Sequence, residues 1–125
     1  MDQFKPEGYN SVSPYLIVNG AQKLIYLLNA IFNVKQLRRY DRPDGKIMHA
    51  EVQLDDSVLM IADATEQYEP NVHLMHVYVE NVDETYKKAI AAGCTSAGEP
   101  EIKEGDPDKR GSFIDFAGNM WAVGT

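Results

Sequence analysis

The sequence is poor in cysteine, in basic residues and in long apolar runs, and each shortage excludes a class of protein. The single cysteine, Cys94, cannot form a disulfide within the chain or supply a cysteine-rich metal site. The 12 Lys and Arg stand against 19 Asp and Glu, a formal net charge of −7, whereas nucleic-acid binding requires clustered cations. No apolar run approaches the roughly 20 residues that span a bilayer. We therefore expect no nucleic-acid partner and no membrane association.

The composition that remains is typical of one globular domain. The 125 residues are 44% hydrophobic and 25% charged, which is enough to bury a core without disulfides or structural metals. The first ten residues, MDQFKPEGYN, contain no apolar signal core. We expect a single cytoplasmic domain over residues 1–125.

Residues 11–63 carry the order strand, helix, strand, strand, strand. The β-branched and aromatic stretch SVSPYLIV (11–18) predicts a strand, and an amphipathic helix follows, with Asn19 as its expected N-cap and an end near Asn33. A strand at 34–40 and a turn at RPDG (42–45) come next. Asp55 and Asp56 then form the turn of a hairpin between 46–54 and 57–63.

Residues 73–125 repeat this order. A strand (73–79) precedes a helix that a capping box of Asn81 and Glu84 opens and Gly93 ends. The stretch 94–102, a charged loop at 103–111 and two closing strands at 112–116 and 119–123 complete the repeat. Placing Val18 on Val79, an offset of 61 (79 − 18), superposes strand on strand and helix on helix. The chain is predicted to be two βαβββ modules, 11–63 and 73–125, joined by a linker at 64–72.

The hairpin at 46–63 has one apolar face and one mixed face. If Leu54 and Ser57 flank the turn, paired positions sum to 111, which gives the pairs Gln53 with Val58, Glu51 with Met60, and His49 with Ala62. The opposite face is wholly apolar and is expected to cover the first helix; its residues are Met48, Ala50, Val52, Leu54, Leu59 and Ile61.

The mixed face predicts a ligand cavity. Alternation in the first strand of each module adds further side chains to it, so the expected ligand-binding residues are Tyr15, His49, Glu51, Gln53, Met60, His76 and Tyr78. This surface is too apolar to be simply solvated. Two such sheets curving toward each other would enclose a cleft of mixed character, which is typical of small-molecule sites.

Four stretches of the sequence resemble the vicinal oxygen chelate superfamily, the glyoxalase, bleomycin-resistance and dioxygenase group, and most closely its PhnB-like branch. They are KPEGYNSVSPYLIVNGA, DGKIMHAEVQLDDSVLMIAD, YVENVDETYKKAIAAG and DFAGNMWAVGT, and together they span nearly all of residues 5–125. The resemblance implies an α+β fold of two βαβββ modules, whose curved mixed sheets surround a central cavity with the helices outside. It also implies a homodimer.

The same resemblance argues against the superfamily's metal chemistry. The places that carry metal ligands in metal-dependent relatives fall on Ser13, Met60, Leu74 and Ala122, and none of these is a good ligand for a divalent ion. The branch's frequent GYHTV, GDRYG and DPFGH stretches appear here as GYNSV, DKRG and DFAGN. We therefore expect no cofactor and no metal at these places.

Two classes of function stay open. Because the superfamily's metal-ligand positions carry no suitable side chains, we favour a metal-free protein that binds and sequesters a small, partly aromatic or amphipathic molecule. The alternative is an enzyme, a lyase, isomerase or dioxygenase, with a divalent ion relocated to His49, Glu51 and His76, or with Glu51 holding His49 in one tautomer while His49 moves a proton. A structural role is also open: His49 and Glu51 as a solvent-facing or dimer-facing pair, and His76 as a hydrogen-bonded interior histidine. Trp121 is expected in the core.

Overall fold

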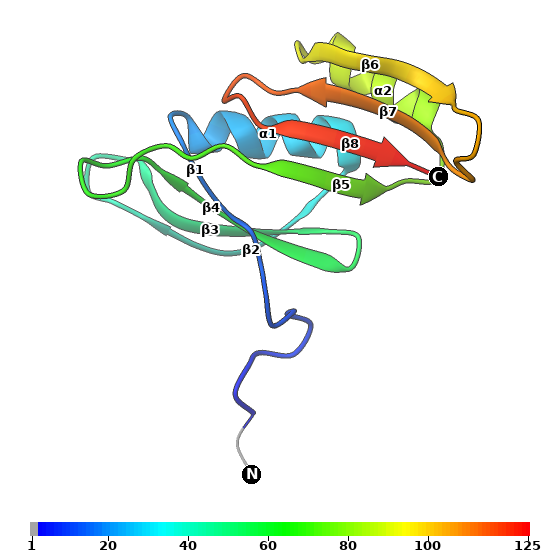
Figure 1. The fold of residues 1–125 in the computed structure, drawn as a ribbon. Coiled ribbons are helices and arrows are strands. Elements are labelled where there is room, and N and C mark those ends of the chain that lie inside the picture. Colours follow the sequence, from blue (N-terminus) through cyan, green and yellow to red (C-terminus); the bar gives the residue numbers. More distant parts are fainter. Residues whose placement is uncertain (1–2) are drawn as a thin grey trace. The chain divides into compact units, whose positions relative to one another are not determined.

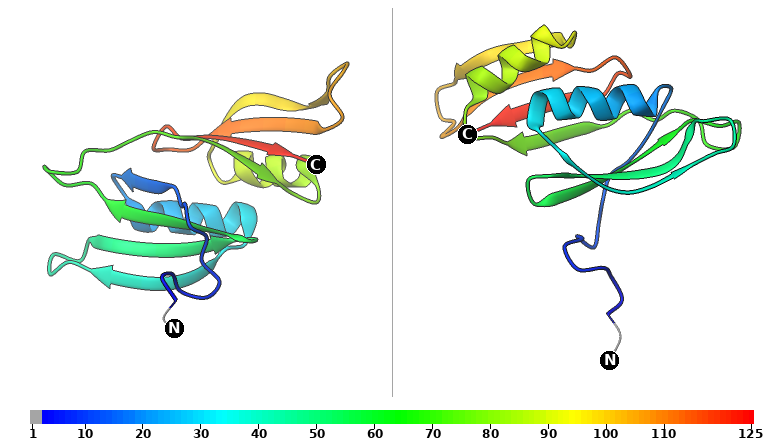
Figure 2. Two further views of the ribbon diagram at one scale, coloured as in Figure 1. Left: turned by 60° about the horizontal axis from the view of Figure 1, so that its bottom comes forward. Right: turned by 180° about the vertical axis from the view of Figure 1, so that it is seen from behind.

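The computed structural model describes residues 3–125 and shows two four-stranded mixed sheets, each in a βαβββ module (Figures 1 and 2). The described chain forms two compact units: the first runs to Ile25 and resumes over Asn33–Asn71, and the second consists of Tyr26–Phe32 and Val72–Thr125. Helix α1 (Ala21–Phe32) thus contributes residues to both units. Within residues 3–125, neither helix has the length and apolarity to cross a membrane.

The first sheet has the strand order β1-β4-β3-β2. Its strands are β1 (Tyr15–Val18), β2 (Lys35–Asp41), β3 (Ile47–Leu54) and β4 (Ser57–Asp63). Strand β1 runs parallel to β4, and the other neighbours are antiparallel. The predicted hairpin register is confirmed, because Glu51 pairs with Met60 and Gln53 pairs with Val58.

The second sheet repeats this topology in the order β5-β8-β7-β6. Its elements are β5 (Leu74–Tyr78), helix α2 (Val82–Ala91), β6 (Thr95–Ile102), β7 (Lys109–Ile114) and β8 (Met120–Gly124). The expected N-cap is confirmed, since the Asn81 side chain accepts a hydrogen bond from the Glu84 amide. The predicted α+β fold of two βαβββ modules is therefore confirmed, whereas a single cavity shared by the two sheets stays a prediction.

Two strands begin more than one residue away from their predicted starts. Strand β1 begins at Tyr15 rather than at residue 11, because the side-chain oxygen of Asn10 takes the Val58 amide of β4, at 3.0 Å, in place of a strand partner. Strand β7 begins at Lys109, inside the stretch expected to be loop. Backbone hydrogen bonds between Lys109 and Thr125 hold that early start.

The apolar face of the first sheet is buried as predicted, with one exception. Ala50, Val52 and Ile61 are fully buried, but Met48 is 54% exposed while its neighbour Ile47 is 1% exposed. The pairing of β2 with β3 shifts register between Tyr40 and Asp41, opposite this point. Such a bulge inserts an extra residue and reverses the alternation of side chains, so assigning Met48 to the helix-facing side was wrong.

Helix α1 begins at a cap that the sequence did not predict. Oδ1 of Asp63, at the end of β4, accepts the amides of Gly20 (3.1 Å) and Ala21 (2.9 Å), and Oδ2 accepts the amide of Ile47 (2.7 Å). Burial alone would raise the pKa of Asp63, but these amide donors and the nearby Arg42 hold it below its ordinary value. One carboxylate thus joins the ends of α1, β3 and β4.

We expect Asp63→Asn to destabilise the protein by about 1 to 2 kcal/mol at neutral pH, since a neutral amide offers one acceptor oxygen where the carboxylate offers two. The matched control is Asp56→Asn in the exposed hairpin turn, which should change the free energy of unfolding by less than about 0.5 kcal/mol. Urea unfolding of the three proteins measures both values.

The same pair of variants has a predicted pH dependence. Because the pKa of Asp63 is lowered on folding, its contribution is complete above the ordinary aspartate pKa and is lost as the pH falls through the lowered value. The advantage of wild type over Asp63→Asn should be constant above about pH 5 and shrink in acid. An advantage that grows in acid would contradict this account of the cap.

Candidate functional site

Glu51 is a buried carboxylate in the middle of β3, with 3% of its surface exposed. Its Oε1 accepts the Tyr9 hydroxyl at 2.5 Å, and its Oε2 accepts Nε2 of His49 at 2.8 Å. A buried carboxylate without such partners is strongly destabilising, so both donors are held to it. The expectation that Glu51 and His49 face the same way is correct, but Glu51 does not face solvent.

The pKa of Glu51 reflects this environment. Burial raises it, but the hydrogen bonds from His49 and Tyr9, the charge of His49 and the Arg38 backbone amide together hold it below its ordinary value. Glu51 is therefore ionised at neutral pH, and it can only accept hydrogen bonds. It follows that Nε2 of His49 carries the hydrogen of that contact, and in the tautomer with hydrogen on Nε2 alone, Nδ1 is an acceptor.

Tyr15 supplies the hydrogen for that acceptor. Its hydroxyl lies 2.7 Å from Nδ1 of His49, and the two rings lie 5.6 Å apart. Burial and the negative charge of Glu51 raise the pKa of Tyr15, so the phenol keeps its proton and donates it. Tyr9, Glu51, His49 and Tyr15 thus form one continuous series of hydrogen bonds, which we call the polar chain.

Other aromatic and cationic groups enclose the polar chain. The Arg38 guanidinium lies 5.3 Å from the centre of the Tyr9 ring, and the Tyr40 ring lies 6.3 Å from that of His49. The sequence reasoning missed Tyr9, because it precedes β1 in a stretch without periodicity and meets Glu51 across 42 positions. The one sequence feature that could have indicated Tyr9 is the GYN triplet, Gly8 to Asn10, which corresponds to GYH in the PhnB-like branch that the chain resembles.

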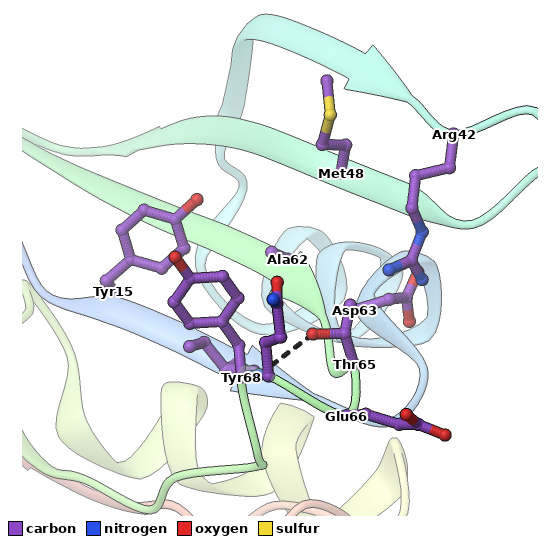
Figure 3. A pocket seen from close by; sticks show the side chains of 10 residues that line it. Tyr15, Arg42, Met48, Ala62, Asp63, Thr65, Glu66 and Tyr68 are labelled. Carbon is purple, nitrogen blue, oxygen red and sulfur yellow. Dashed lines mark hydrogen bonds between the residues drawn. The ribbon is translucent and has the colours of Figure 1, made fainter.

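A pocket of about 630 Å³ opens beside the polar chain within the first unit (Figure 3). Its lining residues are Tyr15, Ile17, Arg42, Met48, Ala62, Asp63, Thr65, Glu66, Gln67 and Tyr68. Figure 3 shows Tyr15 and Tyr68 next to each other on one flank. A turn places Tyr68, since the amide of Tyr68 donates to the Thr65 hydroxyl and the amide of Thr65 donates to the Tyr68 carbonyl, each at 2.9 Å. Tyr15 therefore belongs to both the polar chain and the pocket wall.

The charged groups on the pocket wall are of both signs. The Asp63 carboxylate already accepts hydrogen bonds at the start of α1, and Glu66 lies in the segment 64–72 that follows β4. Nε of Arg42 is buried, lies 3.7 Å from the Asp44 carboxylate and has no hydrogen-bond partner among residues 3–125. The rest of the wall is mainly apolar or aromatic, so the pocket suits an amphipathic molecule better than a highly charged one.

The structure brings three of the predicted site residues together, namely Tyr15, His49 and Glu51. Gln53 and Met60 lie on the same sheet without lining the pocket: Gln53 donates to the Asp55 carbonyl in the hairpin turn, and Met60 pairs with both Tyr15 and Glu51. The sequence reasoning missed several lining residues. Strand alternation predicts the opposite face for Met48, and residues 65–68 lie in the predicted linker, because their turn has no periodic signal.

His76 and Tyr78 belong to the second unit, where their rings lie 4.7 Å apart. Nε2 of His76 lies 2.5 Å from the Arg110 guanidinium, which also pairs with Asp106 (2.8 Å) and Asp108 (2.9 Å). The expectation that His76 is hydrogen-bonded is correct, but an interior position is wrong, because strand alternation places it on an exposed face. The sequence does not predict the contact with Arg110, because Arg110 lies in the loop predicted at 103–111, whereas the structure places it in β7.

The DFAGN stretch in the second unit has a structural role. Asp115 is 5% exposed and accepts hydrogen bonds from the amides of Ala117 and Asn119 and from Nε1 of Trp121. Trp121 is 1% exposed, which confirms its predicted place in the core. Burial and the charge of Asp115 raise the pKa of Cys94 to about 11, so this thiol is unreactive.

Neither the positions where metal-dependent members of the superfamily carry ligands nor the polar chain offers free side chains that suit a divalent ion. Ser13, Met60, Leu74 and Ala122 offer no imidazole or carboxylate, and the Ser13 hydroxyl already accepts from Asn10. At the polar chain, both nitrogens of His49 and both oxygens of Glu51 are engaged by protein partners. The described residues contain no group of three or more His, Cys, Asp or Glu side chains placed to hold a metal ion.

The chain has the fold of the vicinal oxygen chelate superfamily. Among solved structures, it is similar to a glyoxalase/bleomycin resistance protein/dioxygenase family enzyme of Burkholderia phytofirmans, with 15% identity over 88% of this chain and 93% of that one and a TM-score of 0.71. The PhnB protein of Bacillus cereus gives a TM-score of 0.73, at 13% identity over 91% and 98% of the two chains.

A third similar structure contains a metal. It is a variant of the fosfomycin resistance protein FosX of Listeria monocytogenes complexed with Mn(II) and dihydroxypropylphosphonic acid, at 17% identity over 91% and 87% of the chains and a TM-score of 0.70.

In sequence, an uncharacterized protein of Mycobacterium bovis is 27% identical over 91% of this chain and 82% of its own length. No protein-family model matches the sequence.

We expect Tyr9→Phe to cost about 1 to 2 kcal/mol of stability, because it removes a hydrogen bond to a buried carboxylate and leaves Oε1 of Glu51 without that donor. The pKa of Glu51 should rise, since this hydrogen bond helps to lower it. Urea unfolding and NMR titration of the Glu51 carboxyl carbon measure the two effects. The control is Tyr26→Phe, whose side chain is 69% exposed on α1. Equal behaviour of the two variants would show that the contact contributes nothing.

Proposed function

We propose that this protein binds a small, partly aromatic molecule in the pocket of the first unit, and that it does so without a metal ion. The observation that carries the proposal is the pocket itself: about 630 Å³ with two tyrosines, Tyr15 and Tyr68, side by side on its wall. Cavities of a few hundred Å³ with mainly apolar walls and a few fixed polar groups are typical of small-molecule sites.

The wall chemistry sets the class of ligand. Tyrosine rings offer flat faces for an aromatic group, and Met48 offers a flexible thioether that adapts to different shapes. The hydroxyl of Thr65 and the amide of Gln67 supply uncharged hydrogen-bonding groups. A ligand with one aromatic part and one polar, weakly charged part matches this wall.

We propose a cytoplasmic homodimer, as the resemblance to the superfamily implies. Exposed large apolar side chains are compatible with a partner surface, and they include Val72, Leu74, Tyr78 and Ile102, each more than 60% exposed. Fluorescent or drug-like aromatic compounds are the ligands to screen first.

The first test is a titration with 8-anilinonaphthalene-1-sulfonate, an amphipathic aromatic probe. We expect amide shifts in NMR spectra to concentrate at Ile17, Ala62 and Tyr68, and pretreatment with a chelator to leave the affinity unchanged. Tyr68→Ala should weaken binding about tenfold, because loss of one aromatic contact is worth about 1 to 1.5 kcal/mol.

The matched control removes an exposed tyrosine outside the pocket. Tyr26→Ala should bind the probe as wild type does. Equal loss in both variants, or shifts confined to other surfaces, would contradict the proposed site. A loss of binding after chelator treatment would contradict the metal-free proposal.

A further inference from the structure

The hydrogen bonds of the polar chain extend from the buried Glu51 carboxylate out to the pocket, which is farther than satisfying that carboxylate requires. From the fully engaged Glu51 carboxylate, which is 3% exposed, the polar chain passes through the imidazole of His49 and ends at the Tyr15 phenol, which is 37% exposed and lines the pocket. Burial decreases from Glu51 to Tyr15, so this end of the chain meets whatever the pocket contains. A network that only satisfied the Glu51 carboxylate could end at His49.

We propose that Tyr15 is an acid/base catalytic residue that moves protons to and from a molecule bound in the pocket, with His49 and Glu51 as its positioning residues. The inference rests on the proposed binding function and adds a reaction to it. It uses no metal ion, and it assigns the polar chain a role that the pocket alone does not explain.

The arrangement follows the logic of an acid–base–hydroxyl triad. A buried carboxylate fixes the tautomer and orientation of an imidazole, and the free imidazole nitrogen accepts the proton of a hydroxyl as that hydroxyl reacts. Here Glu51 fixes Nε2 of His49 at 2.8 Å, and Nδ1 accepts the Tyr15 hydroxyl at 2.7 Å. The imidazolium that forms during proton transfer is stabilised by the adjacent carboxylate.

The surroundings of the polar chain favour a neutral phenol at rest. Arg38, Tyr40 and Tyr68 lie near it, and the Arg38 guanidinium lies over the ring of Tyr9. The pocket wall that Tyr15 shares adds Arg42, Asp63 and Glu66. The burial and neighbouring charge that keep the proton on Tyr15 oppose a free phenolate. Tyr15 therefore accepts a proton from a ligand only as it passes its own proton to Nδ1 of His49.

The chemistry that this needs from a substrate is limited. A carbon acid beside a carbonyl group loses its proton to the Tyr15 oxygen, while the Tyr15 proton moves to Nδ1 and the electron pair of the C–H bond moves into an enolate. Return of the proton from Nδ1 through Tyr15 to the enolate oxygen gives the enol, and return to carbon gives the ketone. Atoms and electrons balance without any further reactant. The substrate class is an aromatic carbonyl compound with an enolisable C–H bond.

The experiment uses 2-indanone, an uncharged aromatic ketone with acidic C–H bonds, and follows incorporation of deuterium from D₂O by NMR. Wild-type protein should accelerate exchange above the buffer rate. Tyr15→Phe, which keeps the ring and removes the hydroxyl, should lower the protein-catalysed rate at least about 100-fold while its affinity for 2-indanone changes little. The matched control is Tyr26→Phe, which removes the hydroxyl of an exposed tyrosine outside the pocket and should keep the wild-type rate.

The positioning role of Glu51 has its own readout. In Glu51→Gln the imidazolium that forms during proton transfer loses its counter-charge, so the exchange rate at saturating 2-indanone should fall while the affinity for 2-indanone changes little. If Glu51→Gln fails to fold, Tyr9→Phe tests the same link, because it weakens the hold on Glu51 without touching His49 or Tyr15.

Each outcome has a distinct meaning. Binding of 2-indanone at the pocket without catalysis, or catalysis equal in Tyr15→Phe and wild type, overturns the acid/base proposal and leaves the binding function standing. If the pocket binds 8-anilinonaphthalene-1-sulfonate but not millimolar 2-indanone, the proposed substrate class is overturned and the binding function stands; if it binds neither, the binding function is overturned. Catalysis that disappears in Tyr15→Phe, persists in Tyr26→Phe and falls in Glu51→Gln without loss of affinity supports the inference.

Discussion

Burial of the Glu51 carboxylate is the constraint on which the first unit depends. A charged group with 3% exposure requires a hydrogen-bond donor at each oxygen, and the chain provides them from two distant places. One donor, Tyr9, holds the segment before β1 against the sheet. The other, His49, is thereby fixed in the tautomer that accepts the Tyr15 hydroxyl. The position of a pocket-lining phenol thus follows from a buried charge several residues away.

The polar chain offers a chemistry that differs from that of a metal site. A solved structure of the same fold contains Mn(II), whereas in this chain the imidazole of His49 and the carboxylate of Glu51 are hydrogen-bonded to each other and to tyrosine hydroxyls. An imidazole held between a carboxylate and a phenol offers proton transfer, which needs a precise hydrogen-bond geometry and no Lewis acid.

The sequence predicted the parts of this structure that depend on local periodicity. Alternation and the Asp55–Asp56 turn were sufficient for the register of Glu51 with Met60, and helix-capping chemistry was sufficient for the start of α2 at Asn81. The same reasoning placed His49 beside Glu51, which is the centre of the candidate site. These features involve residues a few positions apart, where the backbone geometry alone limits the alternatives.

The parts that failed depend on contacts between distant positions. A bulge opposite Tyr40 and Asp41 moved Met48 to the pocket, because strand alternation cannot show where a register shifts. Asp63 caps α1 from the adjacent strand β4, where it pairs with Val18, 45 positions away along the chain (63 − 18). The role of Tyr9 depends on a partner 42 positions away, and the turn that holds Tyr68 lies in a stretch that reads as linker. Local pattern gave no reason to connect any of these with the site.

The central claim is that Glu51 fixes His49 so that Nδ1 accepts the Tyr15 hydroxyl. The most direct test is to assign the ring nitrogens of His49 by long-range ¹H–¹⁵N NMR at neutral pH. The account predicts a neutral ring with hydrogen on Nε2 and an unprotonated Nδ1, and a changed Nδ1 shift in Tyr15→Phe. Hydrogen on Nδ1, or two nitrogens averaged by rapid exchange, would contradict it.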